Sequence, residues 1–149
     1  MIKIAILNYP QALKSAFYGL EELFLLANSI LEEDALDKPT LEQGAVFNAQ
    51  PLFDIDLINW ATSEYALQQN EQYHAVIIPP SLGSSFYLQD AEKPESQLNQ
   101  WLIAQHQNGA ILSSACAGAF ILANTGLLEG RPVTTHWQLS QKLKDYCPV

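Results

Sequence analysis

Residues 110–128, which read AILSSACAGAFILANTGLL, join an apolar strand pattern to an apolar helix pattern with no polar linker between them. Residues 110–114 begin with an apolar run that is typical of a buried strand. Residues 117–128 would be apolar on nearly all sides of a helix, as in a helix packed deep in the core. Cys116 lies at the junction among small residues. A sharp strand–turn–helix connection needs small neighbours, because its backbone is strained and lies close to other segments.

Similar patterns extend outward from this junction. Strands are predicted over residues 3–7, 46–53, 57–61, 75–78, 110–114 and 132–135. Helices are predicted over residues 11–31, 94–107, 117–128 and 137–146. Asp54 and Asp56 lie between two of the weaker strands and predict a turn. This alternation indicates an α/β fold with a mostly parallel sheet and helices on both faces, in which functional groups collect at the carboxyl ends of the strands.

The composition fits one globular domain. Of 149 residues, 48% are hydrophobic and 15% are charged, and 16 acidic residues against 7 basic ones give a net charge of −9. A nucleic-acid binder needs a basic face, so we do not expect this chain alone to bind DNA or an anionic membrane. No signal-peptide pattern or run of about 18 apolar residues occurs. Two cysteines do not make a disulfide framework, and we expect a cytoplasmic protein.

Cys116 is the first candidate for chemistry. It precedes a predicted helix, whose positive end favours the thiolate, and the thiolate is the nucleophilic and oxidisable form of cysteine. The alternative is that Cys116 is a small buried hydrophobic residue. The spacing alone leaves both interpretations open.

His136 follows the next predicted strand and could approach Cys116 as a general base, or it could simply hydrogen-bond a loop. Backbone amides near Gly83 or Ala117 could stabilise an oxyanion. His74 and His106 lie at the ends of predicted elements and are expected to be structural or solvated. No cluster has metal-ligand spacing and no glycine-rich phosphate loop occurs, so neither a metal nor a cofactor is expected.

Residues 111–137, reading ILSSACAGAFILANTGLLEGRPVTTHW, resemble the nucleophile-elbow region of the ThiJ/PfpI superfamily, which has the class I glutamine amidotransferase-like fold. They are most similar to the branch that forms the N-terminal domain of AraC-type (GlxA-like) transcriptional regulators, and isonitrile hydratases have a similar stretch. Weaker similarity extends over residues 76–79 and 15–24. The resemblance implies a flavodoxin-like three-layer sandwich, often dimeric, with Cys116 at the elbow and His136 nearby.

The chain also departs from the enzymes of this superfamily. Enzymatic branches carry an acidic residue in the first helix beside the cysteine, where this chain has Ala16. Glu21 and Glu22 lie more than one helical turn further on, so neither is a simple substitute. The protease-like branch has histidine directly after the cysteine, where this chain has Ala117. Loss of a positioned acid or base removes assistance worth roughly 10²–10⁴-fold in rate.

Together these features predict a non-catalytic ligand-sensing and dimerisation domain of an AraC-family regulator over residues 1–149. Its small-molecule pocket is expected to involve five residues: Gly83, Ser84, Cys116, Ala117 and His136. The superfamily domain usually continues past the helix after His-Trp, so we expect a truncated domain whose helix-turn-helix, and with it DNA binding, lies outside this chain. The alternatives are a cysteine-dependent hydratase or hydrolase, similar to isonitrile hydratases, and a cysteine redox sensor.

Overall fold

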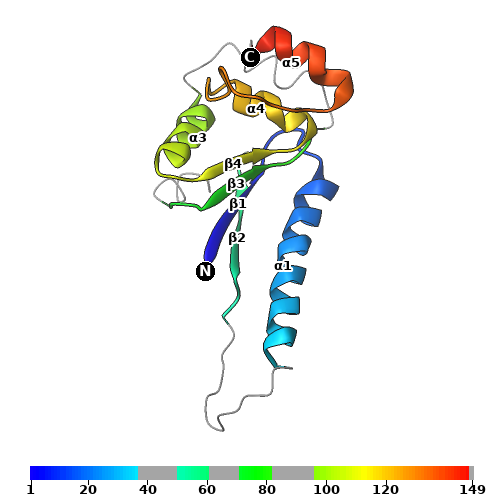
Figure 1. The fold of residues 1–149 in the computed structure, drawn as a ribbon, viewed down its shortest axis with the longest axis vertical. Coiled ribbons are helices and arrows are strands. Elements are labelled where there is room, and N and C mark those ends of the chain that lie inside the picture. The colour runs from blue at the N-terminus through cyan, green and yellow to red at the C-terminus, as the bar shows by residue number, and fades with distance from the viewer. Residues whose placement is uncertain (37–49, 61–70, 82–95, 148–149) are drawn as a thin grey trace.

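The computed structural model describes residues 1–36, 50–60, 71–81 and 96–147, and its sheet is parallel throughout these segments (Figure 1). The strands are β1 (Ile2–Asn8), β2 (Phe53–Asn59), β3 (Ala75–Ile78) and β4 (Ile111–Ser114). They pair in the order β2-β1-β3-β4. This order brings the carboxyl ends of β1, β3 and β4 to one edge of the sheet, as the sequence predicts.

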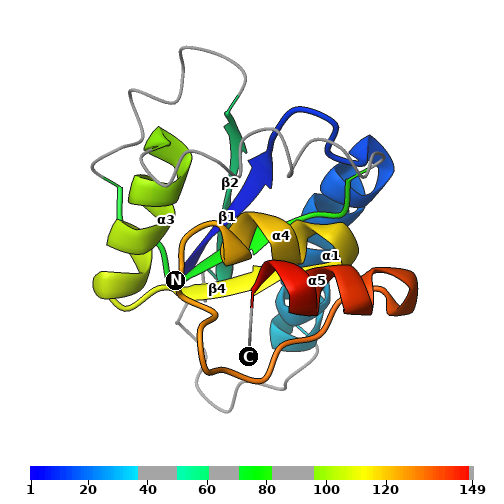
Figure 2. The same cartoon turned by 90° about the horizontal axis from the view of Figure 1, so that it is seen from above.

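Helices cover both faces of the sheet, so the predicted three-layer sandwich is confirmed (Figure 2). They are α1 (Lys14–Leu36), α3 (Gln97–Gln107), α4 (Ala119–Ala123) and α5 (Ser140–Tyr146), with 3-10 turns η2 (Cys116–Gly118) and η3 (Trp137–Leu139). α1 lies on one face against β1 and β2, and α3 and α4 lie on the other. Of the helices in the described segments, none is long and apolar enough to cross a bilayer.

The alternation of side chains along β1 explains the two layers. Ile4 and Ile6 pack with Phe17 of α1. Ala5 and Leu7 point to the opposite face and belong to the core formed with α3 and α4. All four β1 residues are buried, which makes β1 a central strand whose two faces are both covered by helices.

The prediction of two strands separated by a turn around Asp54 and Asp56 is wrong. One strand, β2, runs through both aspartates. The side chain of Asn28 on α1 donates to the Phe53 carbonyl (2.8 Å) and accepts from the Phe53 amide (2.9 Å), which ties the start of β2 to the helix. Because β2 is an edge strand, it tolerates charged side chains that a central strand would not.

Several helix boundaries also differ from the prediction. α1 continues to Leu36, and α4 is much shorter than the predicted helix 117–128. Thr125 ends that helix, because its hydroxyl donates to the Leu122 carbonyl (2.6 Å) and accepts from the Leu127 amide (3.2 Å). Residues 132–135 form no strand. The side chain of Ser96 caps α3 at the Asn99 amide, and Pro94, the predicted first-turn residue, lies outside the described segments.

Candidate functional site

The turn between β4 and α4 places Cys116 in a backbone conformation that non-glycine residues seldom adopt. The φ angle of Cys116 is +53°, in the left-handed region. Such a conformation costs of the order of 1–3 kcal/mol and persists only where the surrounding structure holds it. The geometry agrees with the sharp strand–turn–helix connection predicted from the small residues around this cysteine.

Gly118 holds this turn against the end of β3. A Cβ atom at Gly118 would lie 2.8 Å from the carbonyl oxygens of both Ile78 and Pro79, closer than real Cβ contacts allow. The Ala115 amide also donates to the Ile78 carbonyl (3.0 Å). The turn therefore fits directly onto the end of the neighbouring strand, and the requirement for glycine at position 118 is one of space.

The start of α1 meets the same edge of the sheet. The Leu13 amide donates to the Pro80 carbonyl (2.8 Å), and Ala12 forms an isolated bridge with Ser81. The Tyr9 hydroxyl donates to the Pro79 carbonyl (2.6 Å). Two segments distant in sequence, the β1–α1 turn and the Cys116 turn, thus converge on the end of β3 at residues 78–80.

Cys116 is half-buried and unpaired with any other cysteine. Its carbonyl accepts a hydrogen bond from the Thr135 hydroxyl (2.7 Å), which joins the turn to the segment before η3. Its side chain packs against a small apolar cluster that contains Phe120, Leu143 and Cys147. Within the described segments, no hydrogen bond reaches the Cys116 thiol.

Cys147, the second cysteine, lies in the same cluster but is buried. Burial raises the pKa of the Cys147 thiol, and the nearby negative charge of Glu129 raises it further. Both effects favour the neutral thiol, so Cys147 is a packing residue and Cys116 is the more accessible of the two.

His136 is exposed and caps η3. Its Nδ1 accepts a hydrogen bond from the Gln138 amide (3.3 Å), and its ring lies 5.7 Å from the ring of Trp137. The adjacent Thr135 contacts the Cys116 carbonyl, so the segment that carries His136 lies beside the turn. The role of His136 as a base stays a prediction.

Three further residues were predicted to line the site, and the structure describes one of them. Ala117 is buried at 4% exposure directly after Cys116. Gly83 and Ser84 lie outside the described residues. His74 accepts a hydrogen bond from the Lys3 amide at Nδ1 (3.0 Å), a structural role. His106 lies near the end of α3 with Nδ1 3.4 Å from the Ala110 carbonyl oxygen.

A cavity of about 320 Å³ lies beside the Cys116 turn. Its lining includes Thr135, which contacts the Cys116 carbonyl, and Cys147, which shares the apolar cluster with Cys116. A second cavity, of about 350 Å³, lies near the opposite, amino end of β4. Both volumes fall in the lower part of the range typical of small-molecule sites.

One polar cluster was not anticipated from the sequence. Lys3 forms ion pairs with Glu71 (2.6 Å) and Asp56 (3.4 Å), and Asp56 also accepts from the Tyr73 hydroxyl (2.9 Å). Burial of Tyr73 and its hydrogen bond to Asp56 raise the pKa of that phenol well above its usual range. The signal in the sequence that could have revealed this cluster is Lys3, a cation within the first apolar strand. The cluster joins β1, β2 and the segment that precedes β3, so we assign it a structural role.

Among the residues placed in the structure, no three His, Cys, Asp or Glu side chains gather where they could hold a metal ion. The described residues bring to this site a single half-buried thiol at a strained turn, with a histidine on the neighbouring segment.

Comparison with known proteins is decisive about the family. The profile of the DJ-1/PfpI family matches residues 60–147, more than half of the chain. The chain belongs to the DJ-1/PfpI family. The match includes the whole stretch from β3 to α5 and therefore the Cys116 turn, which confirms the family resemblance seen in the sequence.

Two curated relatives match this DJ-1/PfpI chain over short segments. An "Uncharacterized protein in cpoL 5'region" of Streptomyces lividans is 54% identical over 37 residues, which is 25% of this chain and 26% of that protein. The "HTH-type transcriptional regulator CdhR" of Pseudomonas aeruginosa is 37% identical over 51 residues, 34% of this chain and 15% of the regulator. The matched segments thus span about a quarter or less of either relative's length.

Solved structures share the fold of this DJ-1/PfpI chain at low sequence identity. A "putative transcriptional regulator protein" from Vibrio parahaemolyticus is 16% identical with a TM-score of 0.69, covering 99% of this chain and 73% of that one. An AraC family transcriptional regulator from Pseudomonas putida is 12% identical with a TM-score of 0.61, covering 99% and 74%. Drosophila melanogaster DJ-1beta is 16% identical with a TM-score of 0.56, covering 95% and 69%.

Proposed function

We propose that this chain is a non-catalytic ligand-sensing and dimerisation domain of an AraC-family transcriptional regulator. One observation carries the proposal: within the described segments the Cys116 thiol has no hydrogen-bond partner. The position in the first turn of α1 where the enzymes of this superfamily carry an acid is Ala16. A thiol with no positioned proton donor or acceptor lacks assistance worth roughly 10²–10⁴-fold in rate.

The relatives support a regulatory role. One curated relative is an HTH-type transcriptional regulator, and one protein of the same fold is an AraC family transcriptional regulator. This chain carries a net charge of −9, so in our proposal DNA contact belongs to a separate helix-turn-helix domain encoded in the same protein. The two unpaired cysteines support a reducing, cytoplasmic environment.

In this proposal a small molecule binds near the Cys116 turn, in contact with Ala117, His136, Gly83 and Ser84. The support for this placement is indirect: the 320 Å³ cavity is lined by Thr135, whose hydroxyl contacts the Cys116 carbonyl, but Cys116, Ala117 and His136 are not among its lining residues. Because the turn links β4, α4 and the end of β3, a ligand that prefers one arrangement of these elements would shift the domain between two states.

Turnover assays test the absence of catalysis. We expect the wild-type chain and Cys116→Ser to show the same background rate on a panel of isonitriles, amides and glycated amines, because the thiol lacks a proton-handling partner. The measurement is kcat/KM for each substrate, with Cys147→Ser as the matched control for loss of a thiol.

Wild-type turnover that disappears in Cys116→Ser but persists in Cys147→Ser would overturn the non-catalytic assignment. The cysteine-dependent hydratase or hydrolase alternative would then be the better description of this chain.

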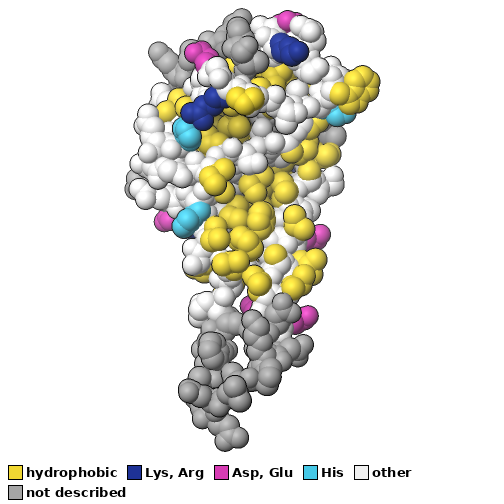
Figure 3. Space-filling view, viewed as in Figure 1, with side chains coloured by type: hydrophobic (Ala, Val, Ile, Leu, Met, Phe, Trp, Pro, Cys, Tyr) yellow, Lys and Arg dark blue, Asp and Glu magenta, His cyan; other side chains and the backbone are white. Residues whose placement is uncertain are grey.

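The dimerisation part of the proposal is supported by an uncharged stripe on α1. Leu23, Leu26 and Ile30 are large, at least half exposed and spaced by three and four residues, so they lie along one side of the helix. Hydrophobic side chains gather over α1 and the adjoining part of the sheet on the face shown in Figure 3. Exposed Glu22 and Glu33 flank the stripe, so two copies can pack its apolar centre against each other while these charges stay at the rim.

Sedimentation tests this interface with a matched pair of leucines. Leu26 is 58% exposed within the stripe, and Leu25 is 50% exposed on another side of the helix, about 100° away. We expect the wild-type chain to be a dimer at micromolar concentration and Leu26→Asp to be monomeric, because the substitution buries a carboxylate at the interface. Leu25→Asp should remain dimeric. A monomeric wild type, or equal dissociation in both variants, would contradict this interface.

A further inference from the structure

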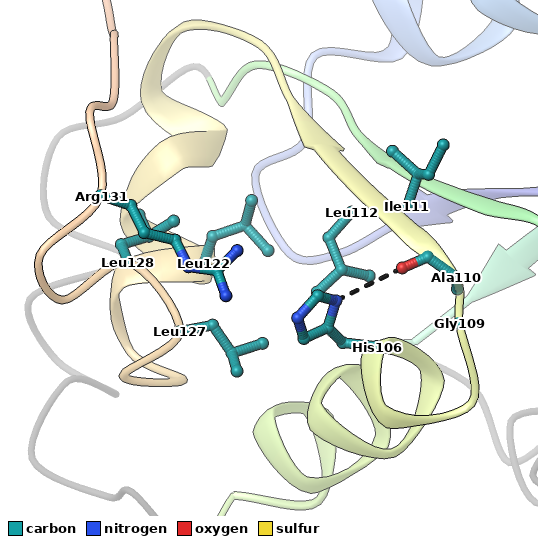
Figure 4. Close-up of a pocket in the computed structure, with 9 residues that line it drawn as sticks. All are labelled: His106, Gly109, Ala110, Ile111, Leu112, Leu122, Leu127, Leu128 and Arg131. Atoms are coloured by element: carbon teal, nitrogen blue, oxygen red, sulfur yellow. Dashed lines mark hydrogen bonds between the residues drawn. The ribbon is translucent and has the colours of Figure 1, made fainter.

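The larger cavity, of about 350 Å³, lies away from the Cys116 turn (Figure 4). It is formed by the end of α3, the start of β4, α4 and the turn that follows α4. Four of its nine lining residues are leucines: Leu112, Leu122, Leu127 and Leu128. Leu112 lies near the amino end of β4, whereas Cys116 follows its carboxyl end. This cavity and the Cys116 turn therefore lie toward opposite ends of that strand.

Arg131 brings a positive charge to this apolar cavity. Figure 4 shows its guanidinium group directed toward the space between the leucines and His106. Within the described parts of the chain Arg131 has no ion-pair partner, although acidic residues outnumber basic ones by 16 to 7. A guanidinium that stays unpaired in so acidic a chain is available to bind an anion.

His106 supplies a second polar group on the opposite wall. Its Nδ1 lies 3.4 Å from the Ala110 carbonyl oxygen, which can only accept, so this contact is a hydrogen bond only in the tautomer that carries the ring proton on Nδ1. Figure 4 shows the other ring nitrogen on the side that faces Leu127 and Arg131. The cavity thus combines apolar walls with one cation, that of the exposed Arg131, and one imidazole nitrogen.

We propose that this cavity binds a monocarboxylate with an apolar tail. The carboxylate pairs with the Arg131 guanidinium, which presents parallel N–H donors suited to a planar carboxylate, and the tail lies along the four leucines. One guanidinium matches one negative charge, whereas a phosphate dianion would leave a charge against leucine side chains. The inference goes beyond the proposed function, because it depends only on this cavity and holds whether or not Cys116 is catalytic.

Titration of the full 149-residue chain with octanoate, followed by amide chemical shifts in two-dimensional NMR, tests the site. We expect saturable shifts in residues around Leu112 and Leu127, and weaker binding of octanol and acetate, which lack the carboxylate and the tail respectively. Arg131→Gln should raise the Kd for octanoate about tenfold or more, because a charge-assisted hydrogen bond is lost.

Two further variants make the test specific. Lys142→Gln removes the same charge on α5, at a residue that lines neither of the two cavities described above, and should leave the Kd unchanged. Leu127→Trp fills the cavity from a half-buried position and should abolish the shifts while the spectrum stays that of a folded chain. Equal Kd values for wild type and Arg131→Gln, equal binding of octanol and octanoate, or no saturable shifts would each overturn the proposal. None of these results bears on turnover by Cys116, so the two proposals fail separately.

Discussion

Phe120→Ala should lower the free energy of unfolding by about 3–5 kcal/mol, the usual cost of removing a fully buried phenylalanine. Phe120 is 0% exposed and is the largest buried residue of the apolar cluster that joins α4 to α5. Its ring centroid lies 5.9 Å from that of Tyr146. The neighbours Ala117, Ala119 and Ala123 are too small to fill the space that the ring leaves, so a cavity remains.

Urea unfolding followed by far-UV circular dichroism measures this loss, and Trp137→Ala provides the control. Trp137 is a larger aromatic residue but is 75% exposed, so its removal should change the free energy of unfolding by less than about 0.5 kcal/mol. A loss below about 1 kcal/mol for Phe120→Ala would mean that α4 does not pack on α5 as described.

Gly118→Ala should also destabilise the chain strongly, by about 1–3 kcal/mol or more. The backbone of Gly118 has φ −57° and ψ −22°, which alanine adopts readily, so the cost cannot come from torsional strain. It comes from the new methyl group, which would lie 2.8 Å from the carbonyl oxygens of Ile78 and Pro79. Both oxygens belong to the backbone at the end of β3 and cannot rotate away as a side chain would.

Gly19→Ala is the matched control for this substitution. Gly19 lies within α1, and a Cβ there would meet nothing within 4 Å. Alanine should therefore raise the free energy of unfolding by about 0.5–1 kcal/mol, because glycine is the poorer helix former. Thermal unfolding of the two variants should shift in opposite directions. A neutral Gly118→Ala would show that the Cys116 turn does not press against β3.

Hydrophobic periodicity predicted the layered fold, because apolar runs and helical spacing indicate which segments are strands and which are helices. The run before Pro79 and the pattern of α1 both gave elements of the correct type. The family resemblance of residues 111–137, a likeness to known proteins and not a result of periodicity, was confirmed as well. The turn at Cys116 was anticipated from its small neighbours, and its positive φ agrees with that expectation.

Local patterns failed where a distant partner decides the conformation. Asp54 and Asp56 favour a turn when read alone, but pairing with β1, and the hold of Asn28 on Phe53, draw them into a strand. The predicted helix over 117–128 stops early because the Thr125 hydroxyl bonds the backbone of Leu122 and Leu127, a competition that apolar content does not reveal.

The sequence by itself determined the class of fold, the position of the strained cysteine and the absence of an acid at residue 16, because each depends on residue type and short-range spacing. Only the tertiary structure decided what surrounds them. It left the Cys116 thiol without a hydrogen-bond partner in the described segments and brought Arg131 and His106 to one apolar cavity. These juxtapositions arise from packing between segments far apart in the chain, which no local pattern encodes.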